Sequence, residues 1–345
     1  MGVSRLNPIA WARKRGAGRT SGRAIVFLLS GLTLDNLLPL GFFLLLGIFI
    51  LGLGVPALMA FAMLHPRRTQ PHDTPANFGI AQWQEVAFTS TDHIRLSGWF
   101  IPPDPNGDGA TIVCAHGLGS HRGQLLRQAA MLIGNGYGAL LFDFRNHGKS
   151  GNAITTLGYT EAADVRGAFD YLSTRPEVNA ERIGMIGYSM GGAAVLRAVV
   201  TLPQVQAIIA EGTYTSLEDN LAEGLLAYTG LPAFPFAPLM LWLGERMSGV
   251  KIQQLRPIDD VARLAPRPIL FVHGKQDNKV AFTNSVKLYQ AAQAAKGLYI
   301  VPGKSHTPVS ASNSEEFTVR VVGFMDWAVR GIDRRSSPRE GLGKE

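Results

Sequence analysis

The sequence predicts an α/β fold, in which a mostly parallel sheet is covered by helices on both faces and one apolar helix comes first. Short apolar runs alternate with helix-forming stretches through most of the chain, as in a parallel sheet. A serine flanked by glycines follows one of these runs and opens a helical stretch. Ahead of the alternating region lies an uncharged run long enough to cross a membrane.

The composition fits one large domain with an appendage. The chain has 345 residues, of which 46% are hydrophobic. The formal net charge is +7, but the basic residues concentrate at the two ends of the chain, so we expect no nucleic-acid partner. The single cysteine, Cys114, has no partner for an intramolecular disulfide.

The segment Leu37–Leu64 contains no charged residue, and its length at about 1.5 Å per residue exceeds a hydrocarbon core of about 30 Å. We expect one transmembrane helix here. Pro56 is expected to kink or end it, which leaves a usable span nearer Leu37–Val55. Basic residues dominate the amino-terminal flank, so the amino terminus is expected in the cytoplasm and the catalytic domain outside it.

Two other interpretations of this region remain open. The apolar stretch Ala24–Leu34 could form a first helix of a hairpin, which would return the domain to the cytoplasm but would place Asp35 in a span. The tripeptide Ala60-Phe61-Ala62 resembles a signal-peptidase site, so the segment could instead be a cleaved signal.

Five regions are expected along the chain. They are a basic segment (1–36), the transmembrane helix (37–64), a linker (65–82), the main domain (83–330) and a polar tail (331–345). The main domain opens with an antiparallel hairpin over Trp83–Pro103. The expected strands that follow are Ala110–Ala115, Ala139–Phe142, Ile183–Ile186, Ala207–Ala210, Pro268–Val272 and Leu298–Val301. The expected helices are Gly123–Ile133, Thr160–Thr174, Gly191–Thr201, Thr283–Ala295 and Glu315–Val329.

One stretch, residues 213–266, has no strand pattern and is expected to be an inserted lid. Its middle, Leu231–Gly244, is rich in Leu, Phe, Pro, Met and Trp. These side chains either pack over the core, which is the ordinary outcome, or present an apolar face to substrate or lipid.

The strongest local signal is Gly187-Tyr188-Ser189-Met190-Gly191, between an apolar run and a helical stretch. A sharp strand-to-helix turn exposes a serine hydroxyl and brings backbone close on both sides, so it needs glycine at positions such as Gly187 and Gly191. The pattern indicates a nucleophilic serine, Ser189.

Two further residues follow candidate strands in the order expected for a serine nucleophile. Asp277 comes after Ile269–Gly274, and His306 comes after Tyr299–Gly303. A serine hydroxyl needs a histidine to accept its proton and a carboxylate to orient that histidine. Ser189, His306 and Asp277 are therefore the candidate catalytic triad.

A fourth motif, starting at His116 and Gly117, follows the apolar run that ends at Ala115. It would supply one backbone N–H for an oxyanion hole, from Leu118, and the residue after the serine, Met190, would supply the second.

With these motifs the chain resembles the α/β-hydrolase superfamily, and within it the serine aminopeptidase and monoacylglycerol lipase-like group, from Trp83 to about Val329. The run Asp143-Phe144-Arg145-Asn146-His147-Gly148-Lys149-Ser150 is similar to the family's D-x-R-x-H-G-x-S loop, and Gly274–Val280 is similar to its acid loop. The resemblance implies the α/β-hydrolase fold. Asn146 stands where many members have glycine.

Four other polar residues near these motifs are expected to act as an alternative acid or to hold loops. Glu211 follows a candidate strand where some members of the fold carry the acid, so it is an alternative to Asp277. His116, His147 and His273 are expected to hold loops through hydrogen bonds. The sequence lacks paired metal-ligand spacing and nucleotide-binding signatures, so no metal and no cofactor are expected.

The sequence thus predicts a membrane-anchored serine hydrolase that cleaves an ester, thioester or lipid acyl bond through an acyl-enzyme, with a small-molecule or lipid substrate. A peptidase or amidase on the same machinery, acyl transfer to an alcohol, and a non-catalytic membrane-tethered scaffold remain alternatives.

Overall fold

The computed structural model describes residues 34–309 and 315–332. The chain divides into two compact units, Met1–Gly54 and Val55–Glu345. The expected basic segment and the first helix of the alternative hairpin lie almost wholly outside the described residues, as does nearly all of the expected polar tail.

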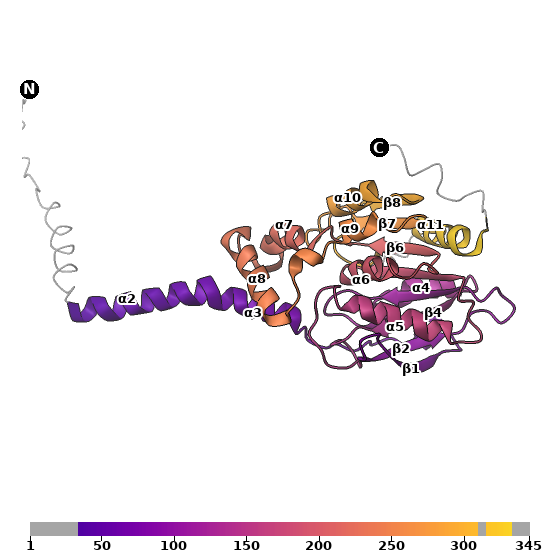
Figure 1. Cartoon of the computed structure of the whole chain (residues 1–345), viewed down its shortest axis with the longest axis horizontal. Helices are drawn as coiled ribbons and strands as arrows, with labels where there is room; N and C mark the ends of the chain where they lie inside the picture. Colours follow the sequence, from indigo (N-terminus) through magenta and orange to yellow (C-terminus); the bar gives the residue numbers. More distant parts are fainter. Residues whose placement is uncertain (1–33, 310–314, 333–345) are drawn as a thin grey trace, which may run out of the picture. The chain divides into compact units, whose positions relative to one another are not determined.

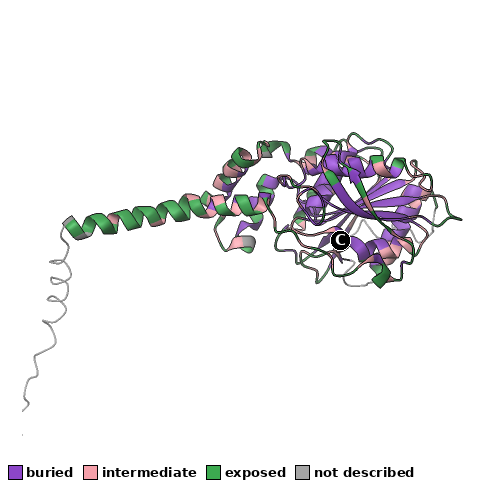
Figure 2. Ribbon diagram, turned by 90° about the horizontal axis from the view of Figure 1, so that it is seen from below, coloured by how far each residue is buried: buried purple, intermediate pink, exposed green. Residues whose placement is uncertain are grey.

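The first unit contains helix α2 (Leu34–Phe49) and a π-helical turn, η1 (Ile50–Gly54). Most of its apolar side chains are exposed, as the green helix in Figure 2 shows. Leu37–Leu64 is the one stretch of the described residues that is long and apolar enough to cross a membrane, by length and composition alone.

The second unit begins with helix α3 (Val55–Leu64), which buries Pro56, Ala60 and Leu64. Of the two effects expected of Pro56, a kink or an end of the helix, the end does not occur, because the helical run continues to Leu64. The preceding turn, η1, is π-helical, and such a turn accommodates a proline ring that would clash with the carbonyl four residues earlier in an α-helix. A short 3₁₀ helix, η2 (Pro75–Phe78), comes before the first strand.

Within the described ranges the strands form one eight-stranded sheet in the order β1-β2-β4-β3-β5-β6-β7-β8. Strands β1 and β2 form the expected antiparallel hairpin, β2 pairs antiparallel with β4, and the other pairs are parallel. The bounds are β1 (Gln84–Thr89), β2 (Arg95–Ile101), β3 (Thr111–Ala115), β4 (Gly138–Asp143), β5 (Ile183–Tyr188), β6 (Ala207–Glu211), β7 (Ile269–Gly274) and β8 (Lys296–Val301).

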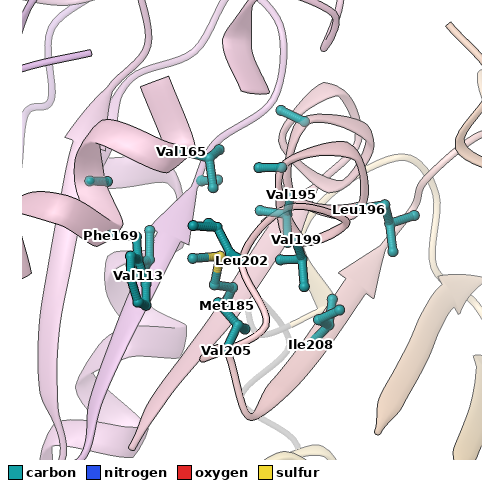
Figure 3. Close-up of a cluster of buried hydrophobic side chains, with 14 of the residues drawn as sticks. Val113, Val165, Phe169, Met185, Val195, Leu196, Val199, Leu202, Val205 and Ile208 are labelled. Carbon is teal, nitrogen blue, oxygen red and sulfur yellow. The ribbon is translucent and has the colours of Figure 1, made fainter. Parts of the chain in front are cut away.

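Helices cover both faces of the sheet (Figure 1). One face packs against α5 (Glu161–Ser173), α6 (Met190–Val199) and α10 (Thr283–Ala291). Figure 3 shows part of this core, where Val165, Phe169 and Val195 meet Val113 and Met185 of the sheet. The other face packs against η3 (Arg122–Leu125), α4 (Leu126–Ile133), α11 (Glu315–Met325) and the π-helical η6 (Asp326–Arg330).

The sequence prediction of an α/β-hydrolase fold is confirmed. Strands β3 to β7 are buried on both faces, which explains why they read as continuous apolar runs. The edge strands β1 and β8 alternate between more and less buried residues. Each expected helix is present, with bounds within a few residues of the expected ones.

The insertion between β6 and β7 contains α7 (Leu217–Thr229), α8 (Ala233–Ser248), a short 3₁₀ helix η4 (Ile252–Gln254) and α9 (Pro257–Val261). Some of its apolar residues pack in the interior and others stay exposed, so both outcomes expected for the insertion occur. Leu221, Leu225, Ala237 and Met240 form a buried cluster. Leu226, Phe234, Trp242 and Met247 stay exposed.

Candidate active site

The carboxyl ends of the central strands bring the predicted site residues to one edge of the sheet. Ser189 follows β5, His116 follows β3, Asp277 comes three residues after β7, and His306 lies in the loop after β8. Because these strands are parallel, their ends meet at the same edge even though the residues are far apart in sequence.

Ser189 lies in a strained turn between β5 and α6. Its backbone has φ 53° and ψ −117°, a region that non-glycine residues seldom occupy. A Cβ atom at Gly191 would lie 2.1 Å from the carbonyl oxygen of Ala115, and one at Gly187 would lie 2.5 Å from that of Gly191. The glycines therefore allow the backbone contacts that hold the serine in this conformation.

Ser189, His306 and Asp277 form a hydrogen-bonded row. The distance from Ser189 Oγ to His306 Nε2 is 3.1 Å, and the distance from His306 Nδ1 to Asp277 Oδ2 is 2.6 Å. With Nδ1–H donating to the carboxylate, Nε2 is left to accept the proton of the serine hydroxyl. All three side chains that the sequence selected are thus brought together.

The carboxyl group of Asp277 is kept ionised by its neighbours. Burial alone would raise its pKa, but hydrogen bonds from His273 and His306 outweigh burial and bring the pKa well below its usual range. The backbone N–H groups of Lys279 and Val280 also donate to Oδ1, each at 2.9 Å. A fixed negative charge therefore faces Nδ1 of His306.

The alternative acid, Glu211, does not contact His306 in the structure. Its Oε1 accepts a hydrogen bond from the backbone N–H of Val309, three residues after the histidine. Burial raises the pKa of Glu211 to about 7, although that hydrogen bond acts in the opposite direction. Glu211 thus holds the loop that carries His306, while the carboxylate beside the imidazole belongs to Asp277.

The two backbone N–H groups expected to form an oxyanion hole, those of Leu118 and Met190, belong to residues that line the same pocket as Ser189. Neither N–H has a hydrogen-bond acceptor among the described residues. The loop of Leu118 is held on both sides: Gly117 N–H donates to Gln124 Oε1 at 2.7 Å, and Gly119 N–H donates to His147 Nε2 at 3.0 Å.

The other histidines of the motifs hold backbone in place. His116 Nε2 accepts from the N–H of Phe144, and its Nδ1 lies 2.7 Å from the carbonyl oxygen of Gly117. Burial lowers the pKa of His116 to about 3, so the ring stays neutral. His273 contacts Ser285 Oγ and the carbonyl oxygen of Val280, and its Nε2 also lies 3.2 Å from Asp277 Oδ2. They hold loops, as the sequence suggested.

The site residues open into a cavity of about 220 Å³. Sequence reasoning missed several residues that line it, among them Met63, Leu157, Tyr214, Asn220 and Lys279. Leu157 has a positive φ of 61°, and its carbonyl oxygen accepts a hydrogen bond from the hydroxyl of Tyr214. No local motif marks these residues. The place of Met63 at the site could not be recognised, because this residue lies inside the apolar run that the sequence analysis assigned to the membrane.

Among the described residues, no group of three or more His, Cys, Asp or Glu side chains is arranged to hold a metal ion. Cys114 is buried, and burial raises the pKa of its thiol to about 12, so it is not a thiolate.

The strand order, the strained serine turn and the residues at the sheet edge are those of the α/β-hydrolase fold. Residues 108–257 of the chain match the family model described as serine aminopeptidase, S33.

Similar proteins are found in several organisms. The uncharacterized protein YfhR of Escherichia coli (strain K12) is 29% identical over 237 residues, which cover 66% of this chain and 76% of that protein. The uncharacterized protein YqkD of Bacillus subtilis is 25% identical over 261 residues, covering 74% and 83%. Among solved structures, the Pyrococcus furiosus esterase Pf2001 superposes with a TM-score of 0.65 at 25% identity, covering 77% of this chain and 98% of that one.

Proposed function

We propose that the protein is a membrane-anchored serine hydrolase that cleaves carboxylic ester bonds, with Ser189, His306 and Asp277 as its catalytic triad. The observation that carries the proposal is the row of hydrogen bonds from Ser189 Oγ through His306 to Asp277. It lies beside two backbone N–H groups that have no acceptor among the described residues.

The chemistry proceeds through an acyl-enzyme. Ser189 Oγ attacks the carbonyl carbon while its proton passes to His306 Nε2, and the N–H groups of Leu118 and Met190 stabilise the negative oxygen that forms, each by about 3 kcal/mol. The imidazolium then gives its proton to the leaving alcohol. A water molecule, deprotonated by His306, releases the acid and restores the serine.

An ester substrate fits the surroundings better than a peptide. The catalytic cavity adjoins a wall of apolar side chains that includes Met63, Leu157 and Leu217. The similarity to the Pyrococcus furiosus esterase supports the same substrate class. The similarity to a serine aminopeptidase family model does not distinguish a peptidase from an esterase. The two classes share the same catalytic residues, and their specificity resides in the pocket.

The test compares Ser189→Ala with the wild-type protein. The variant should lose hydrolysis of a short-chain nitrophenyl ester and labelling by a fluorophosphonate probe. Ser173→Ala is the matched control, because that hydroxyl lies on α5 and bonds only to the carbonyl oxygen of Phe169. Labelling that persists in Ser189→Ala would refute the nucleophile assignment.

We also propose that α2 and η1 cross the membrane. From Leu37 to Gly54 a helix rises about 27 Å, close to the thickness of a hydrocarbon core. Trp242, exposed on the insertion, is a side chain of a type enriched at membrane–water interfaces. The basic amino-terminal flank supports an orientation with the amino terminus in the cytoplasm and the hydrolase domain outside it, because positive charges flanking a span favour the cytoplasmic side.

Protease accessibility tests this orientation. In spheroplasts, an external protease should digest the hydrolase domain while the membrane stays intact. A domain that is digested only after the membrane has been lysed would contradict the orientation.

A further inference from the structure

Helix α3 packs against the insertion as part of the catalytic unit. Its Met59 and Met63 lie against the buried cluster of α7 and α8 that includes Leu221, Ala237 and Met240. Met63 also packs in a second cluster, beside Leu157 and Leu217. One helix therefore contacts both the insertion and the residues around the catalytic cavity.

Hydrogen bonds fix the end of α3 to the catalytic domain. The carbonyl oxygen of its last residue, Leu64, accepts from the backbone N–H of Thr155 at 2.9 Å and from Asn146 Nδ2 at 3.3 Å. After the helix, Arg68 Nη2 donates to the carbonyl oxygen of Gly151 at 3.1 Å, and Thr69 Oγ1 donates to that of Gly119 at 3.3 Å. The helix end is thus held at several points.

A second cavity, of about 40 Å³, lies between α3, α7 and α8. It shares four lining residues with the catalytic cavity: Met63, Leu157, Leu217 and Leu221. Ala60, Met240 and Leu241 line the second cavity alone. The two cavities are therefore neighbours, and Met63 of α3 belongs to the wall between them.

The second cavity offers almost nothing to a polar ligand. Its polar side chains are Thr156 and Ser248, and both hydroxyls are already engaged. Thr156 Oγ1 donates to Glu161 Oε2 at 2.8 Å, and Ser248 Oγ donates to the carbonyl oxygen of Gly244 at 2.7 Å. Only an alkyl group can enter without leaving its own polar atoms unpaired.

We infer that α3 forms part of the substrate site: the cavity between α3, α7 and α8 takes the distal part of an unbranched acyl chain, and Met63 is the movable partition between it and Ser189. The inference rests on the proposed ester hydrolysis. Methionine suits this role because its unbranched side chain has three rotatable bonds and adapts to irregular gaps. The preferred substrate is accordingly an ester of a medium-length straight-chain fatty acid.

The experiment fills the second cavity without touching the catalytic one. Ala60→Leu is made in the full-length protein in lipid nanodiscs, and kcat/KM is measured for nitrophenyl acetate and nitrophenyl octanoate. Octanoate hydrolysis should fall about tenfold or more, since each methylene that loses its buried position costs roughly fourfold. Acetate hydrolysis should stay within about twofold, because the acetyl group does not reach past Met63.

Ala62→Leu is the matched control, since Ala62 is exposed on the same helix and lines neither cavity. It should leave both rates unchanged. Met63→Ala removes the partition and should raise the ratio of octanoate to acetate hydrolysis. If the ratio of octanoate to acetate hydrolysis is equal in the wild type and in Ala60→Leu, the inference is overturned. If the wild type does not hydrolyse nitrophenyl acetate at all, the result counts against the proposed function instead.

A binding measurement tests the cavity independently of catalysis. Octanoate should raise the melting temperature of the wild type and of Ala62→Leu, and should have no effect on Ala60→Leu. If octanoate stabilises all three proteins equally, or none of them, the cavity does not hold the chain.

Discussion

The side-chain amide of Asn146 donates a hydrogen bond to the main-chain carbonyl oxygen of Leu64 across 3.3 Å. Asn146 has φ 60°, a left-handed conformation that glycine adopts freely and asparagine tolerates better than most residues. Asn146 thus keeps the turn and adds a bond to the end of α3. Glycine could supply only the turn.

Substitutions at Asn146 should separate these two contributions. Asn146→Gly keeps the turn and loses the bond, so the free energy of unfolding should fall by about 1 kcal/mol. Asn146→Ala also places a Cβ-bearing residue without a compensating bond at positive φ, which costs about 1–2 kcal/mol more. Urea unfolding of the two variants measures the difference. Equal stability of the two variants would show that the turn does not require this conformation.

Substitutions at Asp277 and at Glu211 should affect activity very differently. Asp277→Asn removes the charge facing His306 Nδ1 and should lower kcat for a nitrophenyl ester by about 10³–10⁴. Glu211→Gln keeps an oxygen for the N–H of Val309 and should retain activity within about tenfold. The reverse result would make Glu211 the catalytic acid.

Glu211 should also govern part of the pH dependence of stability. Its pKa is raised from an ordinary value of 4.5 to about 7, so in this interval the folded protein holds a proton that the unfolded chain has released. The free energy of unfolding therefore falls as the pH rises from about 4.5 to 7, by about 3 kcal/mol at most. Asp277 has a lowered pKa, so its contribution is lost only at more acidic pH.

Glu211→Gln carries no titrating group at this position and should remove that loss of stability. Chemical unfolding of both proteins at pH 5 and pH 7 measures it, and the variant should change less between the two values. The same change in both proteins would show that the Glu211 carboxyl group has an ordinary pKa in the folded state.

Two glycine-to-alanine substitutions should act in opposite directions. Gly191→Ala places a Cβ atom 2.1 Å from the carbonyl oxygen of Ala115 and should lower the free energy of unfolding by about 3 kcal/mol. Gly323, inside α11, has no atom within 4 Å of its Cβ position, so Gly323→Ala should raise stability by about 0.5–1 kcal/mol. Thermal unfolding of both variants tests the pair, and a stable Gly191→Ala would exclude a tight turn at the serine.

The fold and the row of Ser189, His306 and Asp277 could be predicted because their signals are local. Each of these residues follows an apolar strand, and a parallel sheet brings such strand ends together whatever the intervening sequence. Gly187 is required by the backbone of Gly191, close to it in sequence, whereas Gly191 is required by the carbonyl oxygen of Ala115 at the end of the neighbouring strand β3.

The walls of the site could not be predicted, for the opposite reason. Met63 lies more than a hundred residues before Ser189 in an apolar run that gives the same pattern whether it faces lipid or protein. The side of α3 that is buried depends on α8, a helix of the insertion. Likewise, Leu157 carries no motif, and its place follows from tertiary contacts.

The packing of α3 has a consequence for proteolysis in the amino-terminal region of the chain. A cut after Ala62, at the site that resembles a signal-peptidase target, would remove most of α3, and a cut anywhere between Leu64 and β1 would sever it from the domain. Either product would keep Ser189, His306 and Asp277 but would uncover the apolar side of α8. The cleaved form would therefore aggregate more readily and discriminate less between substrates than the full-length protein.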